Sequence, residues 1–166
     1  FVCKEIKHLA GGDEFKLKDA DLVICELDTE FDCDSAILMR SEGKNFLNLN
    51  DCKIFERLGD IVKKWEKINI FTEQFSGAVW HPTCYRMPKE KYDISCKKKI
   101  QGKFDTIAKA ITFLEPSLYI PSAGPPCFLD PMLLEINFQE INIYPRAPRL
   151  LHFLDEHFAG KDIKTK

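Results

Sequence analysis

Residues 35–65 read SAILMRSEGKNFLNLNDCKIFERLGDIVKKW, and the hydrophobic period changes within this stretch at Asp51. Before Asp51, two apolar runs flank a short glycine-containing turn, which predicts a β-hairpin over residues 35–40 and 44–50. After Asp51, apolar residues recur at helical spacing and predict an amphipathic helix over residues 53–65. A strand that passes directly into a helix is typical of an α/β layer structure.

The same patterns extend in both directions from this stretch. Further strands are expected over residues 14–18, 22–27, 69–74 and 117–121, and further helices over residues 89–114 and 148–158. Pro116 stops the long helix, and the polar tail from Lys161 is expected to fray. The 166 residues fit a single domain, residues 1–166, with an α/β fold in which helices cover a mixed sheet.

Composition excludes several classes of partner. The net charge is -2, so no excess of basic residues favours nucleic acid. Apolar residues make up 45% of the chain, but no run approaches the roughly 18 residues that a membrane span needs. The 7 Cys are odd in number and lack C-x-x-C spacing, which favours a reduced, cytoplasmic protein. The first residue is Phe, so the chain is expected to be processed or a fragment.

Small and acidic residues follow three of the expected strands. Asp51 ends one strand, and its carboxylate has two interpretations: it caps the following helix, or it binds a metal ion. Ser76-Gly77 and Ala123-Gly124 follow two other strands. Their backbone amides could approach a ligand closely and receive an anion, or the residues could simply form tight turns.

Histidines are few and scattered. His8, His81, His152 and His157 are the whole set, and no two have H-x-H spacing. His81 lies in the loop before the long helix, where it either packs and hydrogen-bonds or acts as a ligand. The sequence also lacks the C-x-H and C-x-x-H pair that a Rieske iron–sulfur centre needs.

Five short strings occur in order along the chain: DSAILM at 34–39, LNLNDC at 47–52, FSGAVWHP at 75–82, IPSAGPPCFLD at 120–130 and LEIN at 134–137. As an ordered set they resemble the metallo-β-lactamase-like part of the CMP-N-acetylneuraminate hydroxylase family. The resemblance implies the later part of an αββα sandwich. It also implies that Asp51 is a ligand bridging two metal ions, and that the full-length protein holds zinc or iron.

The resemblance further implies a small-molecule substrate, a nucleotide-sugar or another acidic sugar, with no nucleic acid and no membrane. The main metal motif of that superfamily, H-x-H-x-D-H, is missing from this chain. We therefore expect no tightly bound metal in the 166 residues alone, because one Asp cannot fill a zinc site. Two functions follow as hypotheses: part of a metal-dependent hydrolase or oxygenase, or a non-catalytic binding module of the same fold that has lost its metal.

Overall fold

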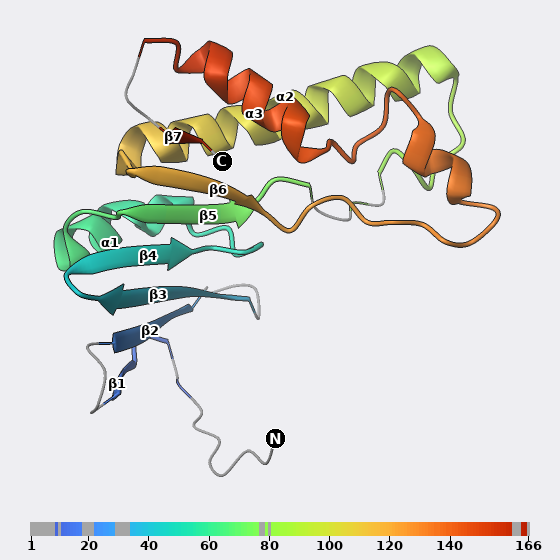
Figure 1. Ribbon diagram of the computed structural model, residues 1–166. Helices are drawn as coiled ribbons and strands as arrows, with labels where there is room; N and C mark the ends of the chain where they lie inside the picture. Colours follow the sequence, from blue (N-terminus) through green and yellow to red (C-terminus); the bar gives the residue numbers. More distant parts are fainter. Residues whose placement is uncertain are drawn as a thin grey trace.

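A computed structural model describes residues 9, 11–17, 22–28, 34–76, 79, 81–160 and 164–165. They form one mixed sheet of seven strands in sequence order, with three α-helices (Figure 1). The strands are β1 Glu14–Leu17, β2 Leu22–Asp28, β3 Ser35–Ser41, β4 Lys44–Asn48, β5 Ile70–Gln74, β6 Leu118–Ser122 and β7 Lys164–Thr165. The helices are α1 Leu58–Trp65, α2 Lys89–Leu114 and α3 Ala147–His157, with short 3₁₀ turns at Phe55–Arg57 and Leu134–Phe138.

The sheet changes character at β4. Strands β1 to β4 pair antiparallel as successive neighbours, whereas β4 to β7 pair parallel. The predicted hairpin of β3 and β4 is confirmed, and its turn has positive φ at Glu42 (48°) and Gly43 (67°). Each parallel strand is reached through a helix, as a crossover connection requires. The predicted α/β class with a mixed sheet is therefore confirmed.

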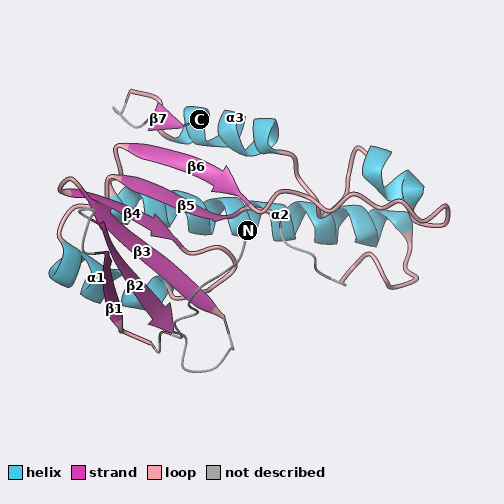
Figure 2. Cartoon of the chain, turned by 60° about the horizontal axis from the view of Figure 1, so that its bottom comes forward, coloured by secondary structure: helices cyan, strands magenta, loops and turns pink. Residues whose placement is uncertain are grey.

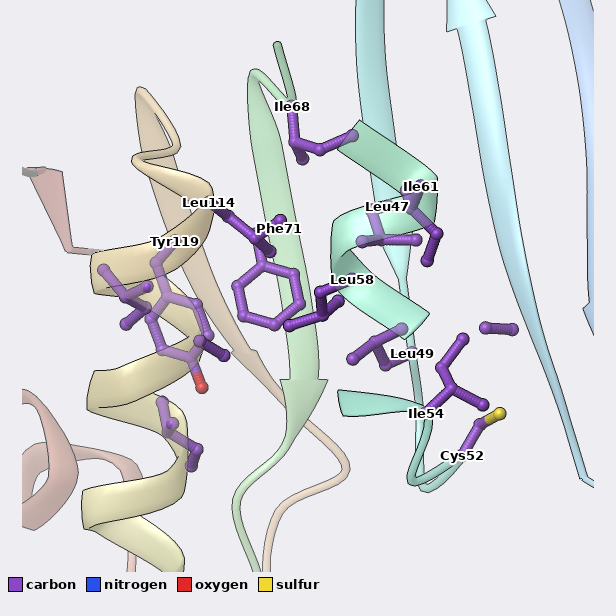
Figure 3. Packing of buried hydrophobic residues seen from close by; sticks show 14 of the residues in the cluster. Leu47, Leu49, Cys52, Ile54, Leu58, Ile61, Ile68, Phe71, Leu114 and Tyr119 are labelled. Atoms are coloured by element: carbon purple, nitrogen blue, oxygen red, sulfur yellow. The ribbon is translucent and has the colours of Figure 1, made fainter. Parts of the chain in front are cut away.

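The hydrophobic core lies between the sheet and the helices. Figure 2 shows the helices beside the strands, and α2 contacts both α1 and α3. A row of fully buried residues in register runs across the sheet at Leu38, Leu47, Phe71 and Tyr119. Figure 3 shows Phe71 and Tyr119 packed against α2 and α1 side chains. The predicted stripe of α2 is buried here: Ile100, Phe104, Ile107, Ala108, Ile111 and Leu114.

The opposite face of the sheet also carries apolar side chains. Strand register places six half-buried residues in one row: Phe15, Ile24, Met39, Phe46, Ile70 and Leu118. Beside this row, Ile37 and Ile120 are 40% and 39% exposed. We call these eight residues the open face. An antiparallel sheet with one solvated face normally alternates apolar and polar residues, and this sheet does not.

Three details differ from the sequence-based predictions. The chain end was expected to fray, but Lys164–Thr165 pair with β6 as a parallel strand. Asp51 caps no helix, because α1 begins at Leu58 after a 3₁₀ turn and has no side-chain cap. The described residues form a single sheet, so the two sheets of an αββα sandwich are not seen among them. In the same residues, no helix is long and apolar enough to cross a membrane.

Candidate functional site

The carboxyl ends of β4, β5 and β6 lie along one edge of the sheet, because these strands are parallel neighbours. Backbone hydrogen bonds continue past the strands and hold their loops together. The Gln74 amide donates to the Asn50 carbonyl at 2.7 Å, and the Phe75 amide donates to the Ser122 carbonyl at 3.2 Å. Ligand sites of open α/β sheets form at this edge. The loops that carry the predicted site residues therefore begin side by side.

Asp51 is exposed at this edge. Its carboxylate accepts a hydrogen bond from the Asn50 side-chain amide at 2.9 Å, and Asn50 has a left-handed φ of 50°. Asp51 also lines a cavity of about 440 Å³ between the β4–α1 loop and α2. Among the described residues, no three His, Cys, Asp or Glu side chains group closely enough to hold a metal ion. A lone exposed carboxylate gives only weak metal binding.

The other predicted loop residues have different environments. Ser76 is buried, and its hydroxyl oxygen has no hydrogen-bond partner; Gly77 lies outside the described residues. Ala123 is exposed with a φ of 46°, and Gly124 lies close to Phe75, whose ring would be 3.7 Å from an added Cβ. His81 is exposed and rests its ring 5.2 Å from that of Tyr85, which fits the packing interpretation of His81.

Glu73, on β5, is the residue at this edge that sequence reasoning missed. It is only 7% exposed, it lines the same cavity as Asp51, and its Oε2 atom is buried without a hydrogen-bond partner. Burial raises the pKa of this carboxyl to about 8, and the nearby Lys103 only partly opposes the rise. Glu73 is therefore mostly protonated at neutral pH and can donate a hydrogen bond. The signal was a single acidic residue inside the expected strand IFTEQF at 70–75.

Three lysines line the cavity around Glu73. Lys99 and Lys103 lie one turn apart on α2 and are half-buried, and Lys53 comes from the β4–α1 loop. Burial lowers the pKa of Lys103, and repulsion from Lys53 and Lys99 lowers it further. The positive charges of Lys53 and Lys99 are therefore close enough to Lys103 to repel its ammonium group. Tyr119 lies nearby, and burial together with Glu73 raises the pKa of its hydroxyl.

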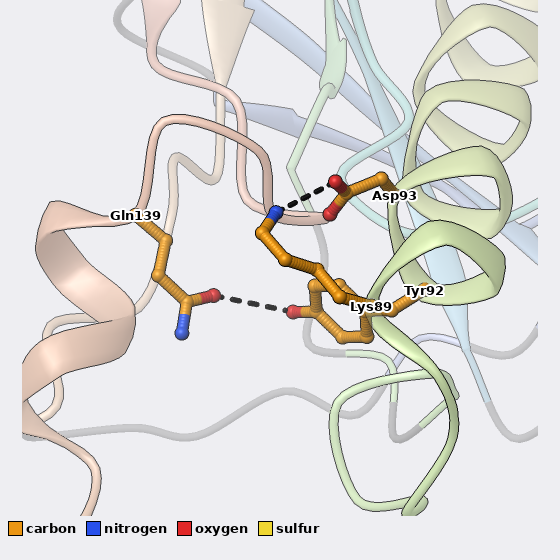
Figure 4. Close-up of polar contacts among 4 residues, drawn as sticks. All are labelled: Lys89, Tyr92, Asp93 and Gln139. Carbon is orange, nitrogen blue, oxygen red and sulfur yellow. Dashed lines mark hydrogen bonds and ion pairs between the residues drawn. The ribbon is translucent and has the colours of Figure 1, made fainter.

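A second, wider cavity of about 940 Å³ lies beyond the end of β6. It extends from Phe75 and Gly124 to Arg146 and Arg149. Its outer wall, the 3₁₀ segment and the residues after it, contacts the start of α2. Figure 4 shows the contact, in which the Tyr92 hydroxyl donates to the Gln139 side-chain carbonyl at 3.4 Å, beside the Lys89–Asp93 ion pair of 2.7 Å.

Several known proteins are similar to this chain in sequence. No known protein-family profile matches the chain. A "Putative Rieske 2Fe-2S iron-sulfur protein" of Mycobacterium tuberculosis is 32% identical over 164 residues, which is 95% of this chain and 30% of that protein. A protein of the same description from Mycolicibacterium smegmatis is 30% identical over 158 residues, 92% of this chain and again 30% of the relative. The chain thus spans less than a third of the length of these relatives.

Comparison of structures adds little. A mutant of the β-hydroxylase CmlA superposes with a TM-score of 0.47 at 11% sequence identity, over 94% of this chain and 31% of that one. A similarity of this size assigns neither a fold family nor an activity. The architecture described above therefore depends on the strands and helices of this chain themselves.

These findings correct the family resemblance. The relatives bear the name of Rieske iron–sulfur proteins, so the identification with the metallo-β-lactamase-like part of the CMP-N-acetylneuraminate hydroxylase family is wrong. Its two functional hypotheses, the metal-dependent hydrolase or hydroxylase and the metal-free module of that fold, are withdrawn with it. The expectation of zinc in the full-length protein is wrong as well, because the name of the relatives specifies iron. DSAILM, LNLNDC and IPSAGPPCFLD overlap β3, β4 and β6, and FSGAVWHP begins directly after β5, where small residues are common in any parallel sheet. LEIN lies in the 3₁₀ segment Leu134–Phe138.

The chain lacks the ligand set of a Rieske cluster. Such a cluster needs two Cys and two His, arranged as C-x-H and C-x-x-H. Neither pattern occurs in the 166 residues. Among the described cysteines, Cys25, Cys52 and Cys96 are buried, whereas Cys84 and Cys127 are exposed, and none belongs to a metal-ligand group. The residues of this chain do not fit a 2Fe–2S cluster.

Proposed function

We propose that this chain is a cluster-free domain, residues 1–166, of a longer iron–sulfur redox protein of the Rieske type. The observation that carries the proposal is the identity of 30–32% over 92–95% of this chain with proteins of that name. The chain matches 30% of their length and lacks the cluster ligands. The cluster, which transfers single electrons, is therefore held by residues outside this sequence.

The open face supports a larger assembly. Eight apolar residues of the sheet stay half-buried or exposed on the side away from the helices. Apolar surface of this kind usually marks an interface. The remaining two-thirds of a protein the size of the relatives would be the occupant of this face, since none of the helices in the described residues covers it.

In this proposal the carboxyl edge of β4 to β6 contributes a small-molecule site to the redox protein. Asp51, Ser76, Gly77, His81, Ala123 and Gly124 are its candidate contact residues. Asp51 remains a candidate metal ligand, and it would need partners from outside this chain to bind a metal firmly. The support is the position of the loops at one edge, where α/β sheets bind ligands.

Iron and acid-labile sulfide content test the proposal directly. The longer protein that contains this sequence is expected to hold two iron atoms and two sulfides per chain and to give the electron paramagnetic resonance signal of a reduced Rieske cluster. The 166-residue chain, purified alone, is expected to hold neither. A cluster in the isolated chain, or a longer protein without iron and sulfide after anaerobic reconstitution, would contradict the proposal.

An Asp51→Ala variant of the longer protein tests the metal role of Asp51 separately. If Asp51 binds a metal ion, the variant should lose metal while its cluster signal stays unchanged. The matched control is Asp60→Ala, which removes an exposed carboxylate on α1 that forms an ion pair with Lys63. Equal metal content in the wild type and both variants would exclude Asp51 as a ligand.

A further inference from the structure

Positive charge gathers in the cavity between the β4–α1 loop and α2. Lys53, Lys99 and Lys103 line it, and within the described part of the chain none of them forms an ion pair. The acidic residues of the lining are Asp51, which is exposed, and Glu73, which is mostly protonated at neutral pH. The chain as a whole is slightly negative, with a net charge of -2. The three ammonium groups therefore outnumber the one exposed carboxylate of the lining, and the cavity carries a local excess of positive charge.

The floor of the cavity carries a second, independent feature. Glu73 is 7% exposed, and its buried Oε2 has no hydrogen-bond partner. A buried polar atom without a partner costs on the order of 1–3 kcal/mol unless a ligand or water satisfies it. A protonated carboxyl is also a donor, which suits an anionic acceptor rather than a cation. The lysines and Glu73 thus favour the same kind of ligand.

The size of the cavity limits the ligand. About 440 Å³ lies in the lower part of the range typical of small-molecule sites. Lysine ammonium groups bind anions as point charges, without the flat two-pronged geometry of arginine. They suit a compact group whose charge is spread over several oxygens. A long or mainly apolar ligand would leave the three ammonium groups unpaired.

We propose that this cavity binds a small polyanion, a compact molecule bearing phosphate or carboxylate groups, with Lys53, Lys99 and Lys103 around it and Glu73 beneath it. The site lies on the helix side of the sheet edge. The proposal does not depend on the iron–sulfur assignment, because its residues come entirely from this chain. A result that contradicts the anion site would not contradict the iron–sulfur proposal, and the reverse also holds.

Isothermal titration calorimetry of the full-length protein with pyrophosphate and with citrate tests the site. The probe that binds more tightly shows whether phosphate or carboxylate is the preferred group. At least one probe is expected to bind with a dissociation constant below 1 mM at 50 mM salt. Its affinity should fall at 300 mM salt, because salt screens the lysine charges. Lys103→Gln is expected to weaken it at least tenfold, and the Lys99→Gln/Lys103→Gln double variant should abolish it.

The matched control is Lys98→Gln, which removes an equal charge from an exposed position of the same helix. It should change the affinity less than twofold. Circular dichroism of each variant checks that α2 is intact. Absence of binding by both probes at 1 mM would overturn the proposal. Equal weakening by Lys98→Gln and Lys103→Gln would overturn it too, because the effect would then come from net charge and not from the cavity.

Discussion

At pH 8 the Glu73→Gln variant should be more stable than the wild type by about 4 kcal/mol, whereas near pH 4.5 the two should be nearly equal. The folded state holds the Glu73 pKa at about 8, against 4.5 for the unfolded carboxyl. Below pH 4.5 the Glu73 carboxyl is protonated in both the folded and the unfolded state, so its ionisation does not lower the unfolding free energy. Between pH 4.5 and 8 the unfolded chain loses the proton and the folded chain keeps it, so wild-type stability falls as pH rises. Glutamine cannot ionise and avoids this loss.

Urea unfolding of both proteins at pH 5, 6.5 and 8 measures the effect. The difference in unfolding free energy should widen steadily with pH, by roughly 1.4 kcal/mol per pH unit at most. Glu140→Gln is the control, because Glu140 is exposed and its variant should track the wild type at every pH. A difference that stays constant with pH would show that the Glu73 carboxyl is ionised in the fold, contrary to its burial.

The regular elements could be predicted because each one buries a face of its own. Helix α2 spans Lys89–Leu114 as expected, since Pro88 precedes it, Pro116 follows it and an apolar stripe runs between them. The hairpin of β3 and β4 follows from alternation around a glycine turn. The pairing of Lys164–Thr165 with β6 could not be predicted, because a short polar end has no periodicity of its own.

The lysine cavity could not be predicted in the same way. Lys53 and Lys103 are 50 positions apart in the sequence, and only the crossover from β5 through α2 brings them to one cavity. In sequence, Lys99 is the last of three consecutive lysines and looks like a solvated helix face. Glu73 gave a local signal, an acid within an apolar strand, but its neighbours come from other elements. Charge networks of this kind are a property of the tertiary fold.

The family resemblance failed for a related reason. Its strings indicated where strands end: Ala123-Gly124 directly follow β6, whereas β4 ends at Asn48, three residues before Asp51. A strand end followed by small residues is a consequence of α/β architecture and is shared by unrelated families. Identity spread over 164 residues carries far more information than five short strings, and the relatives that it finds bear a different name from the family that the strings resembled.

Asn45, on β4, is expected to be the most sensitive polar residue away from the sheet edge, and Asn45→Ala should cost about 3 kcal/mol of unfolding free energy. Its side chain is 4% exposed. The amide nitrogen donates to the carbonyls of Trp65 at 2.6 Å and Lys67 at 3.0 Å, and the side-chain oxygen accepts from Arg40 Nε at 2.8 Å. These carbonyls lie at the last residue of α1 and two residues beyond it, where a helix leaves acceptors without intrahelical partners.

The alanine variant removes three hydrogen bonds at once, which is why its expected cost exceeds that of an ordinary surface change. The Lys67 carbonyl loses its donor from Asn45, whereas the Trp65 carbonyl keeps the longer hydrogen bond from Arg40 Nη2 at 3.2 Å. Asn45→Asp should also be destabilising, because a carboxylate has no proton to donate to the two carbonyl oxygens, although it would keep Arg40 as a partner. Lys44→Ala, at the exposed neighbouring position, should stay within about 0.5 kcal/mol of wild type. Urea unfolding at pH 5 separates this effect from that of Glu73. A cost below 1 kcal/mol for Asn45→Ala would mean that α1 docks through its apolar face alone, with Ile61 and Trp65 sufficient to hold its end against β4.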